Sequence, residues 1–119
     1  SGAAMLVTIS PPDQSVTWII GKNGMLQRRD ADGATQIQHS GVSTDLVAGT
    51  APSATVCWIV GRSGTIIQTT DGEHWTLITS PTSDNLVAVT ASSTNDATIT
   101  TASGQRYATS DGGSSWNPQ

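Results

Sequence analysis

The chain has 119 residues, which is enough for one hydrophobic core without structural metals or disulfide bonds. Its net charge of −4 and its five scattered Lys and Arg residues argue against nucleic-acid binding or an anionic membrane surface, both of which need clustered basic residues. Phe is absent and Ser, Thr, Gly, Val and Ile are frequent, so the composition predicts an all-β fold.

The N-terminus is interpreted as a tag scar or leader over residues 1–5, with a single domain over residues 6–119. No stretch reaches the roughly 18–20 apolar residues of a membrane-spanning helix, so any membrane contact is expected only through segments outside this sequence. Cys57 is the one cysteine, which excludes an intrachain disulfide, and beside Trp58 it is expected to be an inert core thiol.

Three repeats of about 40 residues follow one another, over residues 6–45, 46–85 and 86–119. Each begins with a similar apolar segment, at residues 6–9, 46–49 and 86–89. Residues 18–24 (WIIGKNG) return as residues 58–64 (WIVGRSG), whereas the third repeat has Thr98 in place of the Trp and retains Gly104. Asp71-Gly72 and Asp111-Gly112 keep the same spacing, and Asp30 is a weaker first copy.

Each repeat is predicted to contain four short strands. In the middle repeat they are residues 46–50, 56–60, 65–70 and 75–79, with a tight glycine turn over residues 61–64. Strand segments such as residues 57–60 are apolar at consecutive positions, so both faces of each sheet must be covered. The short length, the β-branched residues and the flanking glycines disfavour a buried helix. Four-stranded sheets stacked face to face are the blades of a β-propeller.

The turn over residues 109–116 (TSDGGSSW) resembles the Asp-box of bacterial neuraminidase repeats at every defined position. The middle copy, residues 69–75, is one residue shorter and has Glu73 in place of the second glycine, and the first copy lacks the Trp. Over residues 6–116 the repeat resembles that of the photosystem II stability/assembly-factor family. The chain is also similar to C-terminal domains of bacterial anti-sigma factors, in which a zinc finger and a membrane helix precede such repeats.

The motif residues are assigned structural rather than chemical roles. In such a turn the Asp accepts backbone N–H groups and the Trp covers the junction between blades. The residues concerned are Trp18, Gly21, Gly24, Trp58, Gly61, Gly64, Asp71, Gly72, Trp75, Asp111, Gly113 and Trp116.

No catalytic, cofactor-binding or metal residue is predicted. Tyr107 and Glu73 are the only Tyr and Glu, and Glu73 lies in a peripheral turn, which disfavours a sialidase. His39 and His74 lie in different repeats without metal-ligand spacing and are expected to be exposed turn residues. Residues 30–33 resemble the start of a calcium loop but lack its later ligands, so a degenerate Asp-box turn is the better interpretation.

Three blades do not make a closed propeller, because at least four are needed. The leading hypothesis is self-association, with a two-fold dimer building a six-bladed ring; the alternative is that the chain belongs to a longer propeller. We expect a non-enzymatic protein-binding, scaffold or sensory module, extracytoplasmic in a bacterium, in a membrane-associated regulator or assembly factor. The alternative is a glycan-binding module with Trp-lined clefts, and a glycosidase or other hydrolase is less favoured.

Overall fold

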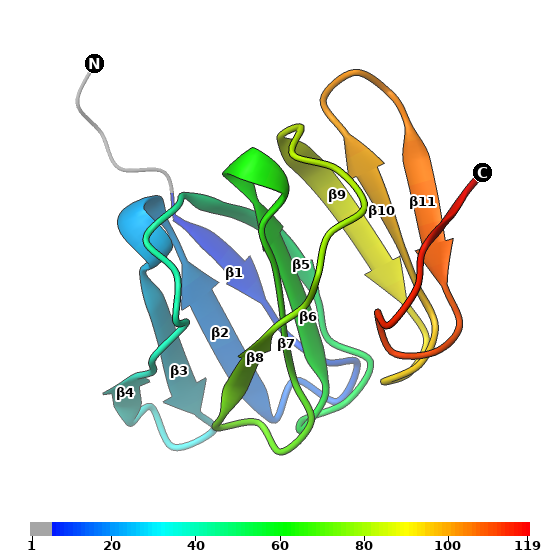
Figure 1. The fold of residues 1–119 in the computed structure, drawn as a ribbon. Coiled ribbons are helices and arrows are strands. Elements are labelled where there is room, and N and C mark those ends of the chain that lie inside the picture. Colours follow the sequence, from blue (N-terminus) through cyan, green and yellow to red (C-terminus); the bar gives the residue numbers. More distant parts are fainter. Residues whose placement is uncertain (1–5) are drawn as a thin grey trace.

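A computed structural model describes residues 6–119 as three four-stranded antiparallel sheets that stand side by side as blades (Figure 1). Within each sheet the strands follow chain order, so each blade is a simple meander. The all-β partial propeller predicted from the sequence is confirmed. The interpretation of residues 1–5 as a tag or leader lies outside the described residues.

The strand boundaries repeat from blade to blade. Blade 1 contains β1 (Val7–Ile9), β2 (Val16–Ile20), the 3-10 turn η1 (Lys22–Gly24), β3 (Leu26–Asp30) and β4 (Thr35–Ile37). Blade 2 contains β5 (Leu46–Thr50), β6 (Cys57–Gly61), the 3-10 turn η2 (Arg62–Gly64), β7 (Ile66–Thr69) and β8 (Trp75–Leu77). Blade 3 contains β9 (Leu86–Ala91), β10 (Ala97–Thr101), β11 (Arg106–Thr109) and β12 (Asn117–Pro118). The last strand, β12, has two residues.

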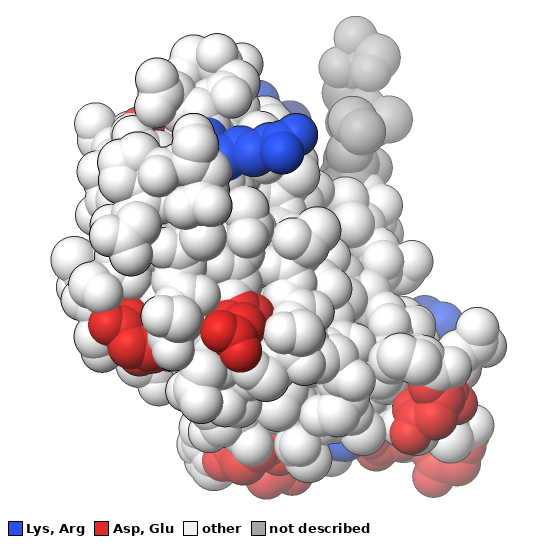
Figure 2. Space-filling view, turned by 90° about the vertical axis from the view of Figure 1, so that its right-hand side faces the viewer, with Lys and Arg blue, Asp and Glu red and all other residues white. Residues whose placement is uncertain are grey.

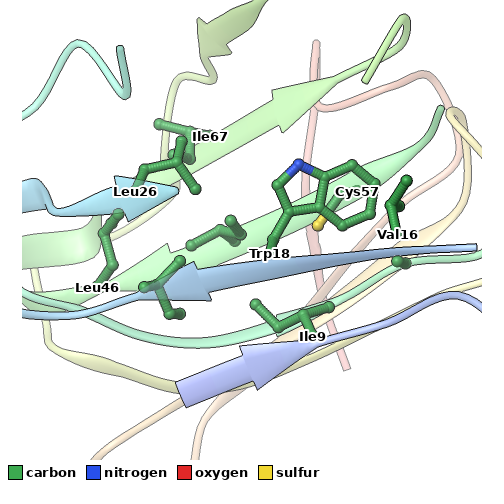
Figure 3. Close-up of a cluster of buried hydrophobic side chains, with 10 residues drawn as sticks. Ile9, Val16, Trp18, Leu26, Leu46, Cys57 and Ile67 are labelled. Atoms are coloured by element: carbon green, nitrogen blue, oxygen red, sulfur yellow. The ribbon is translucent and has the colours of Figure 1, made fainter. Parts of the chain in front are cut away.

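The central blade is buried on both faces because its second strand alternates between two apolar clusters. Cys57 and Ile59 pack into a cluster shared with blade 1, where Trp18 and Val16 lie beside Cys57 (Figure 3). Trp58 and Val60 point the other way, into a cluster shared with blade 3. The consecutive apolar residues of β6 therefore serve two different blade junctions, as the sequence pattern predicts.

The turn between the second and third strands differs from the expected glycine turn. Positive φ angles occur at Ser63 (60°) and Gly64 (70°), whereas Gly61 is extended, with φ of −158°. Gly61 is instead required by close approach, because a Cβ there would lie 2.0 Å from the carbonyl oxygen of Asp45. Asn23 and Gly24 repeat the positive-φ pair in blade 1. Sequence spacing locates this turn and the positive φ of Gly64 correctly, whereas Gly61 is needed for close approach and not for a positive φ.

No helix among residues 6–119 has the length and apolar character needed to cross a membrane.

Candidate functional site: the blade junctions and the inner rim

The four tryptophans form two equivalent edge-to-face pairs, each across a blade junction. Trp18 of blade 1 meets Trp75 of blade 2 with ring centroids 6.2 Å apart, and Trp58 of blade 2 meets Trp116 of blade 3 at 6.1 Å. Trp18 and Trp58 are completely buried. The Trp rings that a sugar-binding cleft would use instead pack between neighbouring blades.

Hydrogen bonds across the junctions follow the aromatic pairs. The Trp75 indole N–H donates to Gln38 Oε1 (2.8 Å), and Gln38 Nε2 donates to the Gly72 carbonyl (3.0 Å). At the other junction, Trp116 donates to the Thr79 carbonyl (3.1 Å), and Trp58 donates to the Ser93 carbonyl (3.0 Å). The described blades are thus connected by directional polar contacts as well as by apolar packing.

The two Asp-box carboxylates accept hydrogen bonds within their own turns. Asp71 Oδ1 accepts the backbone N–H groups of Glu73 (2.9 Å) and His74 (2.8 Å). Asp111 accepts the N–H of Ser115 (2.9 Å) and the hydroxyls of Ser115 (2.6 Å) and Thr109 (2.7 Å). Because these donors favour the ionised form, they lower the pKa of both carboxyls, that of Asp111 to about 2.

The lowered pKa of Asp111 makes the stability of the chain acid-dependent. We expect Asp111→Asn to destabilise the fold at neutral pH, since the neutral amide accepts hydrogen bonds more weakly than the carboxylate. A carboxyl whose pKa is lower in the folded state contributes stability above its unfolded pKa of about 3.9, and that contribution is lost towards the folded pKa. Urea unfolding of both proteins should therefore show a difference that is constant above about pH 5 and shrinks between about pH 4 and 2. A difference independent of pH would contradict this role.

The corresponding turn of blade 1 is not an Asp-box. The Asp30 carboxylate pairs with the Arg28 guanidinium (2.7 Å), and Asp32 rather than Asp30 accepts the N–H of Ala34 (2.9 Å). The turn keeps the hairpin position of an Asp-box but lacks the carboxylate contacts of the other two copies.

The residues considered for catalysis or metal binding lie apart. Tyr107 is on β11 of blade 3, whereas Glu73 is exposed in the β7–β8 turn of blade 2. His39 and His74 are both exposed, and His74 Nδ1 lies 2.7 Å from Asp71 Oδ2, which raises the pKa of the imidazole. Burial raises the pKa of the Cys57 thiol. No three His, Cys, Asp or Glu side chains within residues 6–119 form a metal-binding group.

Two recesses lie side by side along the first strands of the blades, β1, β5 and β9, at the end of the blades that carries η1 and η2 (upper end in Figure 1). The first has a volume of about 150 Å³ and is lined by Val7, Gly21, Lys22, Asp45, Leu46, Val47 and Arg62. The second, of about 230 Å³, is lined by Val47, Arg62, Asn85, Leu86, Val87 and Ala102. We call these residues together the inner rim. Because Val47 and Arg62 belong to both recesses, the inner rim forms one continuous surface.

The inner rim combines exposed cations with apolar side chains. Lys22 and Arg62 occupy the same position in successive repeats, and the Arg62 side chain is 61% exposed. The one carboxylate of the rim, Asp45, lies 3.4 Å from Arg62 Nε and also accepts the N–H of Asn23. Val87 is 51% exposed. The surface therefore offers positive charge and apolar contacts together, which suits an extended, anionic peptide.

Sequence reasoning missed the inner rim because it treated the basic residues as scattered. Lys22 and Arg62 are forty residues apart, one repeat length, so the repeat itself places them on equivalent turns. Asp45 and Asn85 are spaced in the same way, and their side chains accept the N–H groups of Asn23 and Ser63 at 3.0 Å. Comparison of charged residues by repeat position would have revealed the surface.

Comparison with solved structures finds YCF48. A structure of YCF48 from Cyanidioschyzon merolae matches 97% of this chain with 25% sequence identity and a TM-score of 0.74. A structure of YCF48 bound to D1 peptide matches 97% of the chain with 23% identity and a TM-score of 0.78. This chain has the fold of part of the YCF48 propeller. The resemblance to the photosystem II assembly-factor repeat is thereby confirmed.

The chain covers 37% and 40% of the two YCF48 chains, so it spans well under half of their length. No protein-family model and no curated protein matches it significantly. One of the two structures holds YCF48 bound to D1 peptide. The comparison therefore shows a shared fold, and the properties of the inner rim follow from the residues of this chain.

Proposed function

We propose that the chain is a non-enzymatic module that binds an extended peptide segment of a protein partner at the inner rim. The observation that carries this proposal is the continuity of the two recesses, which place Lys22 and Arg62 beside exposed Val87 and half-buried Val47. The YCF48 structure with D1 peptide supports it, since that protein shares the fold and holds a peptide. Anionic and apolar side chains of the peptide fit the rim.

The place of the module in the cell is a separate proposal. The resemblance to C-terminal domains of bacterial anti-sigma factors supports an extracytoplasmic part of a membrane-associated regulator or assembly factor. Glycan recognition has less support, because the most deeply buried rings, Trp18 and Trp58, are inaccessible to a sugar. Hydrolysis has less support still, since the described residues considered for it do not lie together.

Peptide binding is tested with a set of synthetic peptides of equal length that alternate Leu with Glu, Gln or Lys. We expect the Glu peptides to bind most tightly, and amide NMR titration to shift the signals of Lys22, Val47, Arg62 and Val87. The double variant K22A/R62A should weaken this binding at least about tenfold, the size expected when charged contacts at an interface are removed.

The matched control is Arg106→Gln, which removes one exposed cation on blade 3 outside the rim. Its affinity for the Glu peptides should equal that of the unmodified chain. Equal binding of the Glu and Lys peptides, or unchanged binding by K22A/R62A, would overturn the proposal. Binding on a glycan array without peptide binding would favour the glycan alternative.

A further inference from the structure

The outer faces of blade 1 and blade 3, which contact no other described blade, lack the Trp residues found at the two internal junctions. In blades 1 and 2 the second strand presents an apolar stripe to the next blade: Val16, Trp18 and Ile20, then Val56, Trp58 and Val60. In blade 3 the same positions are Asp96, Thr98 and Thr100. On the far side, blade 1 has Thr35 where blades 2 and 3 have the partner Trp. Both halves of the aromatic pair are thus replaced, one at each end.

Blade 3 carries a shallow depression that includes Thr98, the residue that stands where blades 1 and 2 have Trp18 and Trp58. A depression of about 470 Å³ is lined by Thr90, Ala91, Ser92, Asp96, Ala97, Thr98, Ala108 and Thr109. Thr98 stands in place of Trp58, and Ala108 in place of Gln68, whose side chain reaches the Thr94 carbonyl of the next blade (2.8 Å). Both replacements are smaller. Figure 2, which views the molecule from the blade 3 side, shows a broad area of uncharged residues with few charges.

The outer face of blade 1 carries the complementary charge. Cross-strand pairing places Thr17, Arg29 and Thr35 in one row, on the side of the sheet away from Trp18. Arg29 is exposed, and in blade 2 its position is taken by Thr69, the cross-strand partner of Cys57. Cys57 packs in the cluster that contains Val16 (Figure 3), and Asp96 is the blade 3 counterpart of Val16. In a junction built on the same plan, the face that carries Arg29 meets the face that carries Asp96.

We propose that two copies of the chain close a six-bladed ring, in which blade 3 of each copy docks on blade 1 of the other with an Arg29–Asp96 ion pair. The hollow at Thr98 receives the long Arg29 side chain, as the internal junctions receive an indole. Ring closure forms two identical junctions at once, so the second forms within one complex and adds strongly to the affinity of the first.

The proposal is tested by the mass of the chain in solution, measured by light scattering and sedimentation at micromolar concentration and low salt. We expect twice the 12.2 kDa of one chain. Arg29→Asp and Asp96→Arg should each place like charges in the junction and weaken the dimer at least about tenfold, whereas the double exchange R29D/D96R restores it.

The matched control is Glu73→Lys, an exposed charge reversal in the β7–β8 turn, which should leave the mass unchanged. Circular dichroism should show the same β-sheet content for all variants, because Arg29 and Asp96 are both exposed. A monomer at every concentration would overturn the proposal. A dimer unaffected by the single charge reversals would overturn it as well. Neither result bears on peptide binding at the inner rim.

Discussion

Trp58→Ala should destabilise the chain by about 3–5 kcal/mol, which is a large part of the stability of a domain of this size. Trp58 is fully buried in the second cluster, and its ring packs edge-to-face on Trp116 of the next blade. The truncation leaves a cavity at the junction of blades 2 and 3 and also leaves the Ser93 carbonyl without its indole donor.

Urea unfolding followed by far-UV circular dichroism measures this effect independently of the lost fluorescence. The matched control is Trp116→Ala, which removes the other ring of the same pair from a half-buried position and should cost clearly less. A loss below about 1 kcal/mol for Trp58→Ala would show that the junction collapses around the gap, contrary to a tightly packed blade interface.

The repeat made most of the fold predictable. The predicted strand over residues 46–50 agrees with β5, and the predicted fourth strand begins at Trp75 as β8 does. These elements could be predicted because apolar runs, glycines and Asp-Gly turns return at one spacing, so each repeat supports the interpretation of the others. The shorter ends of the other strands depend on local hydrogen bonding, which composition does not specify.

The site was less predictable, because contacts between blades are not local in sequence. Nothing in residues 38 and 72 themselves indicates that the Gln38 amide spans from Trp75 to the Gly72 carbonyl. The ion pair of Asp30 with Arg28 is different, because the two residues lie two positions apart on β3 and therefore share one face of the sheet. Likewise, the equivalence of Lys22 and Arg62 was present in the repeat spacing and was recoverable.

Gly64→Ala should destabilise the chain by at least about 3 kcal/mol, because it combines two penalties at one residue. The first is a φ of +70°, which costs an L-residue roughly 1–2 kcal/mol. The second is contact, since the new Cβ would lie 2.0 Å from the Thr82 carbonyl oxygen in the β8–β9 connection. That oxygen also accepts the Ser80 hydroxyl (2.8 Å), so it cannot move away without breaking a hydrogen bond.

Gly104→Ala is the matched control, because Gly104 holds the same repeat position with φ of +92° but lies on an open turn, where an added Cβ would have no atom within 4 Å. It should therefore pay only the conformational penalty of about 1–2 kcal/mol. Thermal unfolding of both variants separates the two penalties. Equal destabilisation would show that the backbone at Thr82 moves away from the added Cβ at little energetic cost. A larger loss for Gly64→Ala would show that η2 and the β8–β9 connection are locked together, which fixes where blade 3 begins relative to Arg62 and the inner rim.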